Sequence, residues 1–180
     1  DQARFTPGPK TWFSDLPGPH LVNVGRVAVE KNVEAFLKLD VPGTKIVVGD
    51  GPQRAELEER YPEAVFLGQR VGEELVEIYR SADVFVFPSK TDTFGNVMIE
   101  AMACGTPVAA YPVMGPIDVV SQSAAGVLDD DLGAAVRRAL TLSRTAVRRH
   151  AETFTWASST EQFLRALVPA VPAALREAVA

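Results

Sequence analysis

The sequence has only one cysteine, Cys104, which excludes an internal disulfide bond. A lone cysteine is typical of a reducing compartment, so we expect a cytoplasmic protein. An excess of basic charge is also missing. The formal net charge of the 180 residues is −5, which disfavours general nucleic-acid binding because phosphate contacts need clustered lysine and arginine. No apolar run approaches the roughly 20 residues of a membrane-spanning helix. What remains is the balance of an ordinary globular domain, 47% hydrophobic and 23% charged.

Several motifs of catalytic sites are missing as well. The two histidines, His20 and His150, have no partners at metal-ligand spacing, so we expect no metal ion. No serine–histidine–aspartate or cysteine–histidine arrangement is present. Gly49 and Gly51 are followed by Pro52 and lack the G-x-G-x-x-G spacing, which disfavours a dinucleotide-binding dehydrogenase. These two glycines either let the backbone approach a ligand closely or form no more than a strand-to-helix turn.

What the sequence does contain is a regular alternation of short β-branched runs and helical patterns. The strand-like runs are 20–25, 44–49, 64–68, 83–88, 107–112 and 125–128. The helical patterns are 30–39, 53–61, 72–82, 95–104, 132–142 and 153–167. This alternation predicts an α/β fold, a Rossmann-like doubly wound parallel sheet of about six strands flanked by helices. The uninterrupted apolar run 84–87 predicts a central strand that is buried on both faces.

Cations follow the first strand-like run, where ligands bind in open parallel sheets. Gly25 and Arg26 end the run, and Lys31 lies near the start of the next helix. Cations at this position oppose the helix dipole by roughly 0.3–1 kcal/mol, and a bound phosphate would reverse the sign of that effect. The alternative is that both are solvated surface groups, with Glu30 offsetting Lys31.

The segment from Thr91 to Pro107 predicts a loop and then a helix that begins near Gly95 or Asn96. The helix is apolar on all sides and should therefore be buried. It nevertheless carries one carboxylate, Glu100. A carboxylate in a buried helix is costly unless something satisfies it.

Two interpretations of Glu100 are open at this stage. Its partners are either hydroxyl groups of a bound sugar, which donate hydrogen bonds to an ionised carboxylate, or Arg26 or Lys31 in an internal salt bridge. In the first case, Asp92 accepts from a second polyhydroxy group, and the free amides at the start of the helix bind a phosphate.

Four stretches carry a resemblance to a known family. They are “VGRVAVEKN” (24–32), “GDGP” (49–52), “FLGQRV” (66–71) and “DTFGNVMIEAMACGTPV” (92–108). Together they resemble the nucleotide-sugar-binding C-terminal domain of the family-4 glycosyltransferases, which are retaining enzymes of GT-B architecture. The resemblance extends from about His20 to Leu167. The two acids separated by seven residues and followed by “AMACGTP” are its specific part, whereas “GDGP” alone is not.

The resemblance implies a role for each candidate residue. Arg26 and Lys31 would grip the donor diphosphate and stabilise it as the leaving group. Glu100 would hold the ribose hydroxyls, and Asp92 would bind hydroxyls of the transferred sugar; these four form the implied catalytic set. The implied donor-binding positions are Gly25, Gly49, Gly51, Arg70, Val71, Phe94, Gly95, Asn96, Val97 and Glu100. Among them, Arg70 and Val71 belong to the loop that would receive the base.

Two positions depart from the family pattern. The first acid is usually glutamate and is Asp92 here, one methylene shorter. The next residue is usually glycine and is Thr93 here, which does not easily adopt a positive φ. Both departures bear on the preference for the donor sugar more than on nucleotide binding.

The resemblance also implies a larger protein. Residues 1–19, rich in proline and glycine, would be a linker from a preceding acceptor-binding domain, residues 20–168 the donor-binding domain, and residues 169–180 a tail or a short helix. The implied activity is the transfer of a hexose from a UDP-sugar or GDP-sugar to a glycan, a lipid or a small molecule, with retention of configuration and without a metal. The isolated domain would be nearly inactive, and a peripheral location at the inner face of a membrane would depend on the missing half.

Two other classes of function remain as alternatives. One is a non-catalytic nucleotide-binding or regulatory module that kept the fold. The other is a different activity on a related architecture, such as a nucleotide-sugar epimerase, which would consume donor without an acceptor, or a phosphorylase, which would need inorganic phosphate.

Three further signals have simpler interpretations. The segment Asp129–Asp131 contains the DxD metal motif of the other large glycosyltransferase fold, but here it precedes a helix and predicts a cap. Cys104 is expected to be packing. A cluster of arginines suits either an anionic membrane surface or, as we expect, a solvated helical face. The cluster consists of Arg137, Arg138, Arg144, Arg148 and Arg149.

Overall fold

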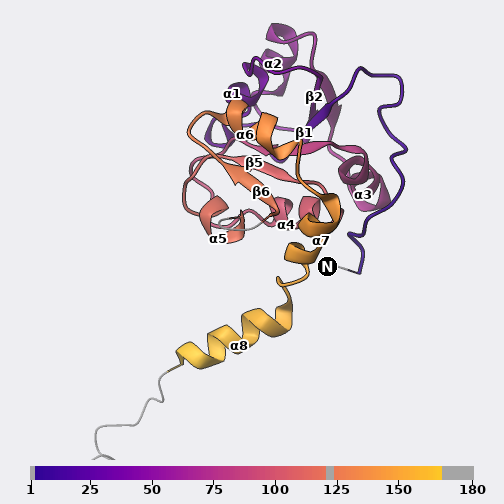
Figure 1. The fold of residues 1–180 in the computed structure, drawn as a ribbon. Helices are drawn as coiled ribbons and strands as arrows, with labels where there is room; N and C mark the ends of the chain where they lie inside the picture. The colour runs from indigo at the N-terminus through magenta and orange to yellow at the C-terminus, as the bar shows by residue number, and fades with distance from the viewer. Residues whose placement is uncertain (1–2, 121–123, 168–180) are drawn as a thin grey trace, which may run out of the picture.

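The computed structural model describes residues 3–120 and 124–167, and the predicted tail at 169–180 lies outside them. Its centre is a parallel six-stranded sheet with the order β3-β2-β1-β4-β5-β6 (Figure 1). The strands are β1 (His20–Val24), β2 (Thr44–Val48), β3 (Val65–Gly68), β4 (Val84–Phe87), β5 (Val108–Ala110) and β6 (Gly126–Leu128). The predicted doubly wound parallel sheet of six strands is therefore confirmed.

Helices lie on both faces of this sheet (Figure 1). They are η1 (Val29–Lys31), α1 (Val33–Leu37), α2 (Arg54–Arg60), α3 (Gly72–Ser81), α4 (Asn96–Ala103), α5 (Pro116–Val120), α6 (Leu132–Ala139), α7 (Arg144–Ala151) and α8 (Trp156–Ala166).

The residues of β4 divide the core into two layers. Val84 and Val86 pack with α1, α2 and α6, whereas Phe85 and Phe87 pack with α3, α4, α5 and α7. Successive side chains of a strand point to opposite faces, so a strand covered on both faces must be apolar throughout. All four residues of β4 are buried, as the uninterrupted run predicted.

The predicted helix at 30–39 is divided into two parts. Asn32 adopts a left-handed conformation, with φ of 54°, between η1 and α1. Asparagine tolerates this conformation better than most residues. Its side chain also compensates for the break, because Nδ2 donates to the carbonyl of Pro88 at 3.0 Å. The predicted helical patterns did not include α5, and they gave no bounds for α7, whose arginines were expected only on a solvated helical face.

The described part of the expected linker packs against the domain along α3. Phe5 and Phe13 are buried. Arg80 Nε donates to the carbonyl of Thr6 at 2.7 Å, and Trp12 Nε1 donates to Glu77 at 3.0 Å. Residues 3–19 therefore contribute to the core of this domain. Their connection to another domain stays a prediction.

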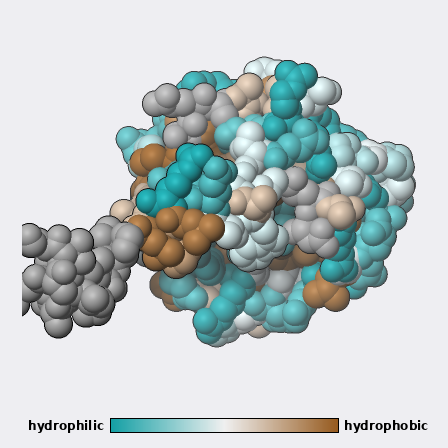
Figure 2. All heavy atoms as spheres, turned by 90° about the horizontal axis from the view of Figure 1, so that it is seen from below, coloured by the Kyte–Doolittle hydropathy of each residue, from teal (hydrophilic) through white to brown (hydrophobic). Residues whose placement is uncertain are grey.

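Helix α8 leaves the domain and extends away from it (Figure 1). Thr155 caps this helix, because its Oγ1 accepts from the amide of Ser158 at 3.0 Å. Phe163, Leu164 and Leu167 form an apolar stripe at the end of this segment, but the stripe is exposed and α8 buries no residue. Elsewhere, the face seen in Figure 2 is mostly hydrophilic, with hydrophobic patches of limited extent.

Candidate functional site

The site begins where β1 and β4, the two central strands, separate. Their register pairs Leu21 with Val84 and Val22 with Phe85, and the next residue, Asn23, donates from Nδ2 to the carbonyl of Val86 at 3.0 Å. The strand order reverses between β1 and β4, and ligands of doubly wound sheets bind at such a point, outside the carboxyl ends of the strands.

A cleft of about 270 Å³, which we call cleft one, opens at this point. The end of β1 contributes Gly25 and Arg26, η1 contributes Lys31, and the loop after β4 contributes Asp92. The amino end of α4 closes the cleft with residues 95–97. Seven predicted site residues thus share one cleft: Gly25, Arg26, Lys31, Asp92, Gly95, Asn96 and Val97.

A second cleft of about 310 Å³, cleft two, adjoins the first at the ends of β2 and β3. It contains Gly49, Asp50 and Arg70, and it shares Gly25 and Arg26 with cleft one. Gly49 must be glycine, because a Cβ there would lie 1.9 Å from the carbonyl oxygen of Gly25. Ligand sites for drug-sized molecules usually measure about 300–1,000 Å³, so the two clefts together suit an elongated ligand.

The two cations of cleft one have acidic partners. Lys31 Nζ lies 2.5 Å from Asp92 Oδ1, and Arg26 Nη1 lies 3.4 Å from Glu30 Oε1. In the alternative that made both cations solvated surface groups, Glu30 was expected to offset Lys31, but it pairs with Arg26. Arg26 is 64% exposed at its side chain, so it can turn towards a ligand at little cost.

One carboxylate oxygen of Asp92, a residue of cleft one, has no hydrogen-bond partner in the described part of the chain. Burial raises the pKa of its carboxyl, but hydrogen bonds from Lys31 and Ser89 and the charge of Lys31 outweigh burial and hold the pKa below the ordinary value. Among the described residues, nothing donates to the buried Oδ2. A buried acceptor without a partner is costly, so Asp92 suits a ligand that donates a hydrogen bond.

The amino end of α4 also lacks a side-chain partner. Gly95, with φ of 84°, is its N-cap, and no side chain caps the helix or places an acid in its first turn. The first amides of a helix and its dipole favour an anion. Thr93, which replaces the glycine usual in the family, does not need a positive φ here. In the described ranges, the non-glycine residues with positive φ are Phe13 and Asn32.

Glu100 lies one turn further along α4 and is not part of the wall of either cleft. Its Oε2 accepts a hydrogen bond from the hydroxyl of Tyr79, at 3.1 Å. Burial raises the pKa of Glu100, while the hydrogen bond from Tyr79 and the charge of Arg4 lower it. The alternative of a salt bridge to Arg26 or Lys31 is wrong, since both cations pair elsewhere.

Other predicted residues lie at the margin. Gly51, Val71 and Phe94 do not line the clefts, and the last two are 66% and 41% exposed. Arg70 lines cleft two, with a buried Nε that has no partner in the described residues.

The sequence interpretation missed Asn23, Asp50, Gln69 and Ser89, which line the clefts. Asn23 could have been found, because it is a polar residue inside an otherwise apolar strand.

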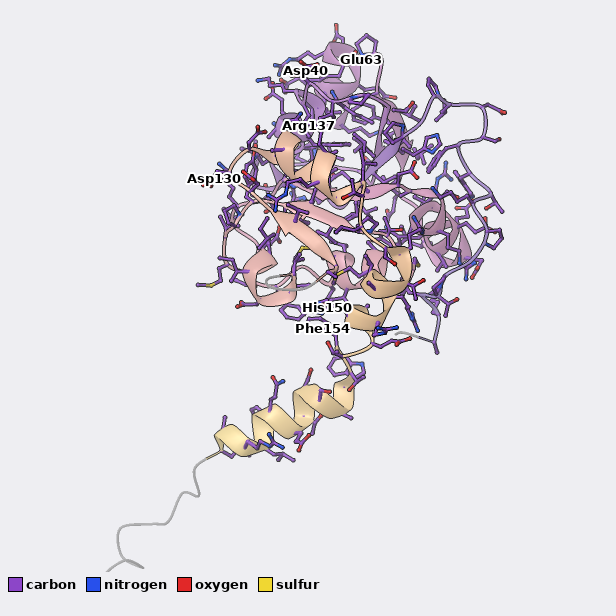
Figure 3. The ribbon with its side chains drawn as sticks, in the orientation of Figure 1. Asp40, Glu63, Asp130, Arg137, His150 and Phe154 are labelled. Atoms are coloured by element: carbon purple, nitrogen blue, oxygen red, sulfur yellow. The ribbon has the colours of Figure 1, made fainter. Side chains whose placement is uncertain are left out.

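The expected cap at the acidic segment is confirmed. Asp131 accepts from the amide of Ala134 at 3.0 Å and caps α6, and Asp129 pairs with Arg138 at 3.3 Å. Figure 3 labels Asp130, which precedes this helix, and Arg137, which belongs to it. Across residues 3–120 and 124–167, no group of three or more histidine, cysteine, aspartate and glutamate side chains could hold a metal ion.

Two of the clustered arginines are not solvated, which corrects the expectation for them. Arg144 donates to the carbonyls of Ala82 at 2.7 Å and Arg80 at 2.8 Å, and Arg148 donates to the carbonyl of Ala103 at 2.7 Å. Burial lowers the pKa of Arg144. These guanidinium groups are structural and are not available to a membrane surface.

Cys104 and His150 are structural too. Cys104 is buried, and burial raises its pKa to about 12, so it is packing as expected. His150 Nε2 lies 2.8 Å from the carbonyl oxygen of Val119 and packs edge-on against Phe154 (Figure 3). None of the helices in residues 3–120 and 124–167 combines the length and the apolar character that a membrane span requires.

Comparison with known proteins identifies similar sequences and folds. The family described as “Glycosyl transferases group 1” matches residues 18–144. A GDP-mannose-dependent alpha-mannosyltransferase of Mycobacterium tuberculosis is 40% identical over 137 residues, which cover 71% of this chain and 36% of that protein. A 2-deoxystreptamine glucosyltransferase of Streptomyces kanamyceticus is 39% identical over 144 residues, which cover 73% of this chain and 36% of that protein. The chain thus spans about a third of the length of these relatives.

Among solved structures, sucrose-phosphate synthase from Thermosynechococcus elongatus has a TM-score of 0.73 and 29% identity. The match covers 92% of this chain and 50% of that one. The fold described above is therefore that of half of a larger known enzyme structure.

Proposed function

Because the chain belongs to the glycosyl transferases group 1 family, we propose that it is the donor-binding part of a retaining glycosyltransferase that uses a nucleoside-diphosphate sugar. The observation that supports this most strongly is the meeting of Arg26, Lys31 and the uncapped amino end of α4 in one cleft at the carboxyl ends of the central strands. Three sources of positive charge in one cleft suit a diphosphate.

The diphosphate would lie in cleft one. Lys31 is a fixed cation there because Asp92 holds it, and Arg26 swings in from the rim that both clefts share. Negative charge grows on the diphosphate as the bond to the sugar breaks. The two cations and the helix amides stabilise that charge, and such preorganised stabilisation is usually the largest contribution to catalysis.

The other parts of the donor follow from this position. The transferred sugar would donate hydrogen bonds to the free Oδ2 of Asp92. The base would occupy cleft two, next to Arg70, and the ribose would bridge towards Glu100. The relative named for GDP-mannose makes guanine the first base to test, with uracil as the second.

Binding of donor nucleotides tests the proposal directly. Calorimetric titration with GDP, UDP and ADP is expected to give measurable heat with at least one of them, and the same nucleotide should raise the melting temperature. Ligand at 100 times its Kd adds about 2.7 kcal/mol to the free energy of unfolding. If none of the three gives heat or stabilisation, the proposal is wrong.

The acceptor is not assigned to this chain. We propose that acceptor binding uses parts of the full-length relatives beyond the matched third, and that the 180 residues alone bind nucleotide with little or no sugar transfer. Robust transfer by the isolated chain would contradict this part of the proposal. Consumption of donor without an acceptor would point to an epimerase instead.

A further inference from the structure

Tyr79, on α3, is a buried tyrosine whose hydroxyl reaches a predicted site residue. Its side chain is 0% exposed, and its hydroxyl donates to Glu100 Oε2 at 3.1 Å. A buried hydroxyl needs a partner, and a phenylalanine of nearly the same shape would fill the same space without one. The hydroxyl therefore calls for an explanation beyond packing.

The surroundings hold Tyr79 in one position. Its ring packs edge-on against Phe5 at 5.9 Å and Phe85 at 5.8 Å between centroids. Its backbone carbonyl accepts from Thr106 Oγ1 at 2.5 Å. Arg144 in turn donates to Thr106 Oγ1 at 3.1 Å. These contacts fix the position of the ring and therefore the position of its hydroxyl.

Arg144 also ties α3 to α4. It donates to the carbonyls of Arg80 and Ala82 at the end of α3, and its Nη2 lies 3.4 Å from the carbonyl oxygen of Cys104 at the end of α4. The helix that carries the tyrosine and the helix that carries the glutamate are therefore fixed relative to each other.

The chemistry of the pair leaves one carboxylate oxygen of Glu100 for a ligand. Burial, and then the charge of Glu100, raise the pKa of Tyr79 well above its ordinary value, so the phenol remains a donor. The bond occupies Oε2 and limits rotation of the carboxylate. Glu100 is only partly buried, so its other oxygen can accept from a hydroxyl group that approaches the helix.

We propose that Tyr79 is a positioning residue that orients the Glu100 carboxylate towards the ribose hydroxyls of the bound nucleotide. The inference rests on the proposed function and deepens it. It assigns a specific task to a residue of α3 that lines neither cleft.

The test compares Tyr79→Phe with the unchanged chain, using GDP, UDP and their 2′,3′-dideoxy counterparts in calorimetric titrations. The unchanged chain should bind the ribose form more tightly than the dideoxy form. Tyr79→Phe should weaken binding of the ribose form roughly 3- to 10-fold, the effect of one hydrogen bond, and leave the dideoxy form unchanged. A matched control is Tyr61→Phe, which removes a hydroxyl that donates to Glu34 at 3.0 Å away from the clefts. It should change neither affinity.

A pH profile separates positioning from mere support of the fold. Tyr79 and the charge of Arg4 lower the pKa of Glu100, against the larger effect of burial. Cys104, a further titratable group whose pKa responds to Glu100, stays neutral because burial raises that pKa to about 12. Glu100 binds hydroxyls best when ionised, so affinity should fall as the pH drops through its pKa. Tyr79→Phe removes a group that lowers this pKa, so the fall should begin at higher pH than in the unchanged chain.

The outcomes are distinguishable. No binding of any nucleotide by the unchanged chain would overturn the proposed function, and this inference with it. If Tyr79→Phe loses equal affinity for the ribose and dideoxy forms, or loses affinity for neither, the inference is wrong while the proposed function stands.

If Tyr79→Phe does not fold, replacing the three tyrosines by 3-fluorotyrosine gives a second measurement. The fluorinated phenol is a stronger hydrogen-bond donor and should lower the pKa of Glu100 further. The fall in nucleotide affinity at acid pH should therefore begin at lower pH. If this fall begins at the same pH as in the unchanged chain, the inference is also wrong.

Discussion

The two ends of α4 are built in opposite ways. At the carboxyl end, Arg148 donates to the carbonyl of Ala103 at 2.7 Å, and Arg144 lies 3.4 Å from the carbonyl oxygen of Cys104. At the amino end, no side chain caps the helix, and Gly95 and Asn96 line an open cleft. One end has its polar groups satisfied within the fold, and the other keeps them for a ligand. A buried helix can therefore be fixed at one end by the fold and present its other end to a ligand.

The largest effect is expected from removing the hydrogen bonds at the carboxyl end of α4. Arg144→Ala should lower the free energy of unfolding by about 3 kcal/mol, because it leaves buried carbonyls of α3 and α4 without a donor. Urea unfolding measures this. The control is Arg149→Ala, at an exposed arginine of α7, the helix that also carries Arg144. It should change the free energy of unfolding by no more than about 0.5 kcal/mol. A loss below about 1 kcal/mol for Arg144→Ala would contradict the structural role of this end.

The next effect concerns binding at the open end. Lys31→Ala should weaken affinity for the nucleoside diphosphate about 10- to 30-fold, because it removes a charge-assisted contact. Its free energy of unfolding should change by no more than about 1 kcal/mol, since the Lys31–Asp92 pair is partly exposed. Calorimetry and urea unfolding give the two numbers. The control is Lys38→Ala, whose partner Glu34 lies outside the clefts. Equal affinities in Lys31→Ala and Lys38→Ala would remove Lys31 from the site.

A smaller effect is expected at the cap itself. Gly95→Ala should cost about 1–2 kcal/mol, because φ is 84° and the added Cβ would lie 2.7 Å from Met98 Cε. Thermal unfolding measures the cost. Nucleotide affinity should fall together with stability, because the first amides of α4 shift with residue 95. Unchanged affinity in a destabilised variant would show that these amides do not contact the ligand.

The smallest effect is a pH dependence. The pKa of Asp92 is lower in the folded chain than its ordinary value of 3.8, so its contribution to stability is present above that value and is lost as the pH falls through the folded pKa. Asp92→Asn should reduce the free energy of unfolding by about 0.5–1 kcal/mol at pH 7 and flatten its slope below about pH 4. Urea unfolding at several pH values tests this, and an unchanged slope would rule out the Lys31–Asp92 pair as its origin.

The fold could be predicted because its signals are local. The apolar runs that became the six strands alternate with helical patterns, and Asp131 caps α6 as the acidic segment predicted. The misses have local causes too. Asn32 divides a predicted helix by adopting a left-handed conformation, and the arginines of α7 hide a helix whose buried side is only Val147 and Ala151.

The candidate site could be predicted in part. Glycines and cations after strands pointed to Gly25, Arg26 and Lys31, which the parallel sheet brings to one edge. The partners of those charges could not be predicted. Pairing of Lys31 with Asp92 joins residues 61 positions apart, and nothing local distinguishes it from pairing with Glu30.

The order of strands and helices and the residue types at the strand ends follow from the amino-acid sequence, because backbone periodicity and turn chemistry act over a few residues. That Arg144 satisfies two helix ends and that Tyr79 donates to Glu100 could be learned only from the folded chain. Both contacts join separate elements, and only the packing of α3, α4 and α7 on the sheet sets the distances between them.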